Sequence, residues 1–257
     1  TTYCGYKLSD QYRHEKKIVE ERNKLHISGF EKVIQFVERD LEPNWNINQV
    51  TNQQSLHIHW VIPHFTPGLG GHMTIFRCIE YLERYGHQCT VWIHSEMKGD
   101  RPNRLSSMHK RIIDQHFIKL QTDQIFILGN NNEDLDSICG DIVIATDRMS
   151  TYPVLGMRKF KKRFYFVQDY EAYFFAQGTT TVLTENSYSA DHNFTCICAS
   201  PWLKQLMIDR GNTAEAFPLA IDPNIYNNII NDQKEDPIEQ TIAFYVRRST
   251  PRRLYEL

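Results

Sequence analysis

Short apolar runs that alternate with segments of helical periodicity are the main pattern of this chain. The first run, Trp-Val-Ile at 60–62, is followed by a proline and a glycine-rich loop, which predicts a buried parallel strand rather than a helix. From His72 onward the apolar residues recur at helix spacing, at Ile75, Phe76, Ile79, Tyr81 and Leu82. Gly86 then stands where a helix-ending glycine is expected. A strand, a glycine loop and a helix in this order predict the first crossover of a doubly wound α/β domain.

Six further apolar runs predict strands of the same sheet. They lie at 89–94, 124–128, 141–146, 163–168, 194–199 and 214–219, and residues 105–117 have the periodicity of a helix. Strands that are apolar throughout and alternate with helical segments are typical of a parallel sheet covered on both faces. We therefore expect a Rossmann-like, doubly wound α/β domain over residues 56–226.

The two ends of the chain differ from this domain in composition. Residues 9–41 are rich in Lys, Glu, Arg and Gln with apolar positions at helical spacing, so residues 1–55 are predicted to form a helical extension and a linker. Residues 227–240 are rich in Asn, Asp, Glu and Gln, which is typical of an interdomain linker. Residues 241–257 begin with a new apolar strand and are expected to be the truncated start of a second α/β domain.

Composition and charge exclude several classes of protein. The 257 residues include 29 Lys and Arg against 31 Asp and Glu, a net charge of -2, so the sequence has no basic footprint for nucleic acid. The apolar runs are too short to span a bilayer, and the first residues lack the pattern of a signal peptide. The six cysteines form no C-x-x-C pair, which favours buried free thiols in a reducing compartment. We expect a soluble, cytoplasmic protein.

The glycine loop after the first strand is the first candidate binding element. Gly68, Gly70 and Gly71 lie directly before the predicted helix, so backbone N–H groups and a helix N-terminus would face a ligand, with a phosphorylated ligand as the first expectation. The loop lacks the third glycine of a dinucleotide fingerprint and the Lys-Ser/Thr of a P-loop. The alternative is a tight turn whose glycines only permit positive φ. The sequence leaves both open.

Polar residues follow several of the predicted strands. Because the carboxyl ends of parallel strands meet at one crevice, these residues are candidates for a common site. They are His64, Thr66, Gly70, Gly71 and His72; Thr146, Asp147 and Arg148; Gln168, Asp169, Tyr170 and Glu171; and Ser200 and Trp202. Carboxylates and amides suit sugar hydroxyls, arginines suit phosphate, and the rings of Tyr152, Tyr170 and Trp202 suit the faces of sugars. His57 and His59 lack carboxylate partners at ligand spacing, so no metal site is expected.

Five sequence motifs occur in an order that resembles a known family. They are P-G-x-G-G-H-M-T-I-F at 67–76, F-V-Q-D-Y-E at 166–171, T-E-N-S-Y at 184–188, A-S-P-W-L at 199–203 and F-P-L-A-I-D-P-N-I-Y at 217–226. This succession resembles bacterial glycosyltransferases of the GT-B fold, of the retaining family-4 kind, and is most similar to the rhamnosyltransferases of rhamnan and S-layer glycan synthesis. The resemblance runs from residue 57 to the end, and several ordered motifs make it more specific than one glycine loop.

The resemblance implies two Rossmann-like domains that face a cleft, with the glycan acceptor mainly on the first and the nucleotide-sugar donor mainly on the second. It also implies a retaining transfer that needs no metal and no cofactor besides the donor substrate, here dTDP-L-rhamnose. Gly70 and Gly71 would lie under the donor phosphates, and Arg247 and Arg252 would neutralise the diphosphate leaving group. Arg252 departs from the pattern, since relatives usually have Lys at this position.

The residue that orients the acceptor hydroxyl stays open between two candidates. Relatives carry a His at the end of the fourth strand, where this sequence reads Thr146-Asp147, so the role falls to Asp147 or His72. The alternatives are that Asp147 is a helix N-cap and that His72 only begins a helix. The acceptor sugar is expected to be bound by Gln168, Asp169, Tyr170, Glu171 and Glu185.

Some of these acceptor residues also have structural alternatives. Asp169 and Glu171 would then cap the next helix, and Glu185 would pack the segment before the sixth strand. Two functions are therefore weighed. The first is a transferase that adds L-rhamnose to a growing bacterial cell-surface polysaccharide, with peripheral association to the inner membrane through a lipid-linked acceptor. The second is a non-catalytic carbohydrate-binding or assembly module.

Overall fold

A computed structural model describes residues 55–94, 104–129 and 132–217 of the chain. The predicted N-terminal extension up to residue 54, the linker at 227–240 and the start of a second domain at 241–257 lie outside the described residues. Arg247 and Arg252 lie there as well, so their contact with a diphosphate stays a prediction. The predicted domain boundaries also stay predictions.

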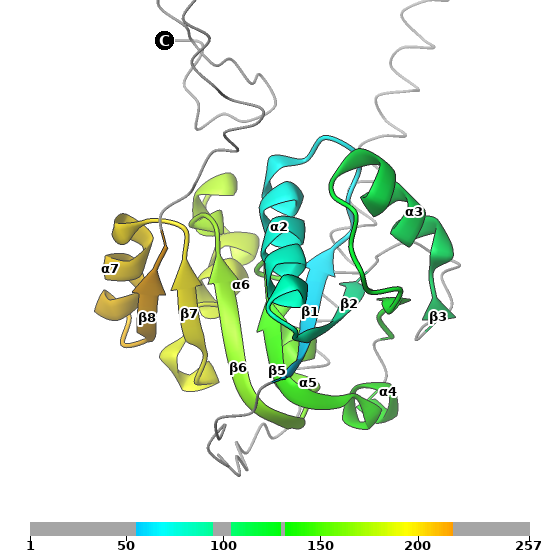
Figure 1. Cartoon of the computed structure of the whole chain (residues 1–257). Helices are drawn as coiled ribbons and strands as arrows, with labels where there is room; N and C mark the ends of the chain where they lie inside the picture. Colours follow the sequence, from blue (N-terminus) through cyan, green and yellow to red (C-terminus); the bar gives the residue numbers. More distant parts are fainter. Residues whose placement is uncertain (1–54, 95–103, 130–131, 218–257) are drawn as a thin grey trace, which may run out of the picture.

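Eight strands form one sheet (Figure 1). Its order is β3-β4-β2-β1-β5-β6-β7-β8, and all neighbouring strands are parallel except β3, which runs antiparallel to β4. The strands are β1 (His57–Pro63), β2 (Gln88–His94), β3 (Arg104–Leu105), β4 (Ile125–Ile127), β5 (Cys139–Ala145), β6 (Lys159–Val167), β7 (Thr195–Cys198) and β8 (Thr213–Ala216). The predicted doubly wound parallel sheet is confirmed, because the chain moves outward from β1 first in one direction and then in the other.

Helices cover both faces of this sheet. They are α2 (Gly70–Arg84), α3 (Ser107–His116), α4 (Asn132–Ser137), α5 (Thr151–Gly156), α6 (Thr179–Asn186) and α7 (Pro201–Asp209), with short 3-10 turns η1 (Glu171–Phe174) and η2 (Ala190–His192). Helices α2 and α3 contribute to one apolar core, and α4, α5 and α7 contribute to the other; Figure 1 shows α2 in front of the sheet. None of the described helices is long and apolar enough to cross a membrane.

Strand β1 lies inside the sheet and is buried on both faces. Trp60 and Ile62 point into the core under α2, whereas Val61 points into the core of the opposite face. Each of these side chains is at most 2% exposed, and burying such a side chain stabilises the fold by about 1.5–3 kcal/mol. The run at 60–62 is apolar throughout because both faces of the strand need apolar side chains.

The helix predicted at 105–117 begins two residues later than expected. Leu105 belongs to the short edge strand β3, which pairs with β4 and was not predicted. Ser106 caps α3, since its hydroxyl accepts a hydrogen bond from the backbone N–H of His109. A two-residue strand is too short to show an alternating pattern of apolar and polar residues, so the predicted helix wrongly included Leu105.

Strand β6 begins four residues before its predicted start at 163. Among residues 159–162 only Phe160 is buried, so the segment has no apolar run to mark it. Lys161 pairs with Asp141 of β5 at 2.7 Å, and this ion pair joins the polar starts of the two strands. A strand that begins with polar residues cannot be recognised from apolar content.

Gly140 in β5 is a position where a side chain does not fit. A Cβ added there would lie 2.8 Å from a ring carbon of Phe160 and 3.0 Å from the ring of His59. Gly140→Ala is therefore expected to lower the free energy of unfolding by about 1–3 kcal/mol, as measured by urea unfolding followed by circular dichroism. Gly71→Ala is the matched control, because its Cβ would meet Gln168 at an ordinary contact distance of 3.5 Å. An equal loss in both variants would contradict this explanation.

Candidate functional site

The candidate site, which we call the crevice, is the carboxyl edge of the sheet at the point where the strand order changes direction. Strands β1 and β5 are neighbours, but the chain leaves β1 toward α2 on one face and leaves β5 toward α5 on the other. Doubly wound sheets bind their ligands at such a switch point. The predicted candidates that follow these two strands therefore define the site.

The N-terminus of α2 begins at this edge. Its N-cap residue makes no side-chain cap bond and its first turn has no acidic residue, so the N–H groups and the positive end of the helix dipole suit an anion. Gly70 and Gly71 are exposed, and a Cβ on Gly70 would meet no atom of the described chain within 4 Å. Of the three loop glycines only Gly68 has a positive φ, of 87°, which a residue with a side chain rarely adopts. The room beside Gly70 fits the predicted place of the donor phosphates.

A histidine and an aspartate from different strands meet in the crevice. His94 ends β2 and Asp147 follows β5, and His94 Nε2 lies 3.0 Å from Asp147 Oδ1. The Asp147 carboxylate also accepts hydrogen bonds from the backbone N–H groups of Met149 and Ser150. Asp147 thus organises the turn before α5 and holds His94 at the same time. The N-cap residue of α5 is Ser150, so the predicted alternative that Asp147 is a helix N-cap is not observed, whereas its role as a site residue stays a prediction.

The surroundings of Asp147 set its pKa and thereby determine whether Asp147 or His94 carries the proton of their hydrogen bond. Burial alone would raise the pKa of Asp147, but the attraction of His94 and the hydrogen bonds from His94, Ser150 and Met149 outweigh it and lower the pKa. An ionised carboxylate can only accept hydrogen bonds, so Nε2 of His94 carries a proton and donates it to Asp147. In neutral His94 the remaining nitrogen, Nδ1, is then an acceptor for a hydroxyl group.

Glu171 places a second carboxyl group near Asp147. Its Oε1 accepts a hydrogen bond from the backbone N–H of Arg148 at 3.2 Å, and its Oε2 lies 3.8 Å from Arg148 Nε. Burial and the negative charge of Asp147 raise the pKa of Glu171 to about 8, although Arg148 opposes the shift. Glu171 is therefore mostly protonated near neutral pH and can donate a hydrogen bond.

Two further predicted residues lie against the loop after β1. His72 is buried in the first turn of α2, and its Nε2 lies 3.2 Å from the carbonyl oxygen of Pro63. Burial lowers the pKa of His72, so its neutral ring donates to this carbonyl and ties the helix to β1. Gln168, which follows β6, lies with its amide within 3.5 Å of a Cβ built on Gly71. The structure thus brings Gly71 and Gln168 together. His72 instead uses its Nε2 in the contact with the backbone carbonyl of Pro63.

Tyr170 and Glu185 also meet, and of the two only Tyr170 is buried. The hydroxyl of Tyr170 lies 3.2 Å from Glu185 Oε1 and accepts a hydrogen bond from Arg210. Tyr170 is only 3% exposed and Tyr152 is buried as well. The sequence predicted that both rings would face a sugar, but neither ring is accessible to one. Asp169 Oδ1 accepts the hydrogen bond of the Tyr170 backbone N–H, which is a local turn contact.

Two exposed aromatic rings lie beyond these buried residues. Trp202 at the start of α7 is 53% exposed, and Tyr173 in η1 is 59% exposed. Their ring centroids lie 6.4 Å apart, with an angle of 27° between the ring planes, so the two rings form one exposed aromatic surface. Trp202 was predicted from the sequence, whereas Tyr173 was not, because a single tyrosine in a turn belongs to no pattern.

His94 is the main site residue that sequence reasoning missed. It is the last residue of a parallel strand next to β1, so the strand-end rule that indicated Asp147 would also have indicated His94. Its contact with Asp147 had no sequence signal, because the two residues meet only when β2 and β5 flank β1. In the described ranges, no group of three or more His, Cys, Asp or Glu side chains could hold a metal ion.

Comparison with known proteins gives a distant relative. The chain is similar to the O-antigen biosynthesis protein RfbC of Myxococcus xanthus, with 26% identity over 203 residues. The alignment covers 77% of this chain and 15% of that protein, so the chain spans a small part of its relative's length. No family model matches the sequence, and no solved structure matches it significantly.

The protonated state of Glu171 gives a testable pH dependence of stability. Its pKa is about 8 in the folded chain and about 4.3 in an unfolded chain, so its contribution is fully present below the lower value and is lost as the pH rises toward the higher one. Glu171→Gln cannot ionise but keeps an oxygen for Arg148. We expect it to raise the free energy of unfolding by about 1–3 kcal/mol at pH 8 and to change it little at pH 4.5.

Urea unfolding at the two pH values measures this difference. Glu185→Gln is the matched control, because it makes the same chemical change on an exposed carboxyl group. A stabilisation of Glu171→Gln that is the same at both pH values, or that the control shares, would contradict a protonated Glu171.

Proposed function

We propose that the chain is the acceptor-side part of a glycosyltransferase that builds a bacterial cell-surface polysaccharide. The observation that carries the proposal is the His94–Asp147 pair at the switch point, beside the exposed start of α2. Similarity to a protein named for O-antigen biosynthesis supports the substrate class. In finer detail, the donor is dTDP-L-rhamnose, the transfer is retaining and metal-independent, and the complete enzyme has the GT-B fold.

The pair suits the orientation of an acceptor hydroxyl. With Nε2 bound to Asp147, Nδ1 of His94 accepts the hydrogen bond of the attacking hydroxyl. The fixed carboxylate holds the ring and stabilises positive charge that develops on it. The protonated carboxyl of Glu171 and the amide of Gln168 offer hydrogen bonds to other hydroxyls of the acceptor sugar.

The start of α2 suits the donor phosphates. When the anomeric C–O bond breaks, the departing nucleoside diphosphate gains negative charge, which the enzyme has to stabilise. The N–H groups at Gly70 and Gly71 supply hydrogen bonds, and Arg247 and Arg252 supply positive charge without a metal. The partners of the protein are then the nucleotide-sugar and a glycan acceptor. A lipid-linked acceptor would bring it to the cytoplasmic face of the inner membrane.

His94→Ala tests the central role of the pair. It is expected to lower kcat by about 100-fold or more with little change in the KM of the donor, because the lost group acts on the acceptor hydroxyl. The complete enzyme that contains this chain is incubated with dTDP-L-rhamnose and a rhamnose oligosaccharide, and released dTDP and elongated glycan are measured by chromatography and mass spectrometry. His116→Ala, which removes an exposed histidine at the end of α3, is the matched control.

The outcomes of this experiment separate the two functions. Full activity of His94→Ala would contradict the role of the pair. No turnover by the complete protein without substitutions, with binding of the oligosaccharide retained, would favour a non-catalytic carbohydrate-binding or assembly module. Circular dichroism of each variant shows whether a loss of activity reflects loss of the fold.

The surface formed by Tyr173 and Trp202 gives a second test. An exposed aromatic surface, in the segments that follow β6 and β7, suits the apolar face of an acceptor sugar. Trp202→Ala is expected to raise the KM of the oligosaccharide about tenfold, which corresponds to about 1.4 kcal/mol, and to leave kcat unchanged. Tyr85→Ala is the control, because Tyr85 is an exposed ring at the other end of α2. The same rise of KM in both variants would rule out a specific contact.

A further inference from the structure

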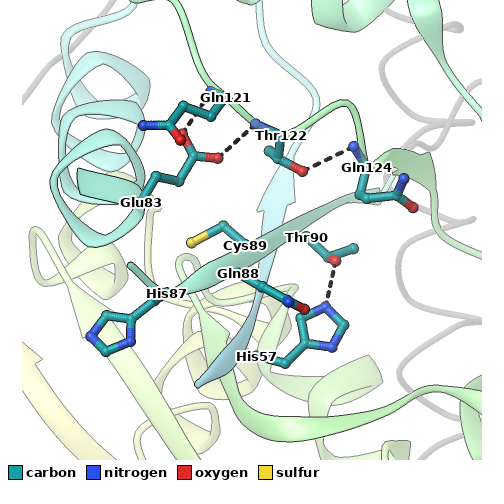
Figure 2. Close-up of a pocket in the computed structure, with 9 residues that line it drawn as sticks. All are labelled: His57, Glu83, His87, Gln88, Cys89, Thr90, Gln121, Thr122 and Gln124. Atoms are coloured by element: carbon teal, nitrogen blue, oxygen red, sulfur yellow. Dashed lines mark hydrogen bonds between the residues drawn. The ribbon is translucent and has the colours of Figure 1, made fainter. Parts of the chain in front are cut away.

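A hollow lies at the opposite, amino-terminal edge of the sheet (Figure 2). It has a volume of about 440 Å³ and is lined by the starts of β1 and β2, the end of α2 and residues 121–124 before β4. His94 and Asp147 lie at the other edge of the same sheet. The pocket is therefore separate from the crevice, and its own side chains define what it can bind.

A chain of hydrogen bonds connects the core to this pocket. Trp92 Nε1 donates to His59 Nδ1 at 2.9 Å, and His59 Nε2 lies 3.4 Å from His57 Nδ1. His57 Nε2 in turn lies 2.9 Å from Thr90 Oγ1, a contact that Figure 2 shows at the pocket. Burial lowers the pKa of both histidines, that of His59 to about 3. Both rings are therefore neutral at pH 7.

The indole of Trp92 fixes which atom donates in each of these hydrogen bonds. An indole N–H can only donate, so Nδ1 of His59 is the acceptor and its Nε2 carries the proton. His57 then accepts at Nδ1 and donates from Nε2 to the hydroxyl oxygen of Thr90. This oxygen then accepts one hydrogen bond, and the hydroxyl hydrogen of Thr90 can still be donated to a ligand. Thr90 thus offers a hydrogen-bond donor to the pocket.

The outer wall of the pocket is fixed in place and carries carboxamide groups. The two carboxylate oxygens of Glu83 accept the backbone N–H groups of Gln121 at 2.7 Å and Thr122 at 2.8 Å. This pair of bonds, drawn in Figure 2, ties the segment before β4 to the end of α2. Gln88, Gln121 and Gln124 are exposed and line the pocket. Each carboxamide can donate and accept, which matches the two abilities of a hydroxyl group.

The charge of the pocket disfavours anions. No Lys or Arg is among its described lining residues, and both oxygens of Glu83 are already engaged. The end of α2 also brings the negative end of the helix dipole to this edge. Phosphate would meet no cation here, whereas a neutral ligand with several hydroxyls would find both donors and acceptors.

We propose that this pocket is a second binding site, for a neutral saccharide. That the saccharide is a stretch of the polysaccharide rests on the proposed function, whereas the preference for a neutral, hydroxyl-rich ligand rests on the pocket alone. A glycan held at this edge as well as in the crevice contacts one protein at two places, which raises its effective concentration at the site of transfer.

Direct binding to the full chain tests this site. A rhamnose trisaccharide and inorganic phosphate are titrated separately into 15N-labelled protein, and amide signals are followed by NMR. The trisaccharide is expected to shift the signals of Thr90 and Gln124. Thr90→Val, which removes the hydroxyl, is expected to weaken binding at these signals about tenfold, as for one lost hydrogen bond. Thr90→Ser keeps the hydroxyl and is expected to bind like the unchanged chain.

The readout is independent of sugar transfer, so the two proposals can fail separately. His94→Ala is expected to leave the shifts of Thr90 and Gln124 intact even where turnover is lost. Shifts confined to the carboxyl edge, equal affinity of Thr90→Val and Thr90→Ser, or tighter binding of phosphate than of the trisaccharide would overturn the second site. If Thr90→Val does not fold, Gln124→Ala takes its place, since this exposed side chain is expected to weaken binding without loss of the fold.

Discussion

Double burial of β1 is the constraint on which the structure depends. The strand is hydrogen-bonded to β2 and β5 and covered on both faces, so its middle has to be apolar throughout, as Trp60, Val61 and Ile62 are. With β1 fixed in this place, the ends of β2 and β5 lie on either side of it. His94 then reaches Asp147 across the end of β1. The crevice is thus a consequence of where one strand lies.

Burial and neighbouring groups give the two carboxyl groups of the crevice opposite protonation states. Asp147 keeps its charge because His94 and two backbone N–H groups surround it with donors. Glu171 is buried beside the negative charge of Asp147, and these two effects outweigh the opposing effect of Arg148, so Glu171 keeps its proton. One group is therefore a fixed anion that orients an imidazole, and the other is a neutral carboxyl that can donate a hydrogen bond. Opposite environments of this kind give two identical functional groups different roles.

The sequence predicts this fold well where burial is complete and poorly where it is not. The run at 60–62 and the alternation of strands and helices follow from two buried faces, but β3 and the polar start of β6 have no such signal. In the site, the strand-end rule indicated Asp147 and Gln168. The contact of Asp147 with His94 joins residues 53 positions apart and depends on the strand order, which periodicity does not contain.

The two edges of the sheet differ in charge because each crossover helix runs antiparallel to its strand. The N-terminus of α2 lies at the carboxyl edge and its C-terminus lies at the amino edge, so the helix dipole favours an anion at the first and disfavours it at the second. Under the proposed function, a donor diphosphate would therefore be restricted to the crevice. A neutral glycan would have no such restriction, since hydroxyls can bind carboxamides and hydroxyls at either edge. A long polysaccharide would then occupy the amino edge without competing with the donor for the start of α2.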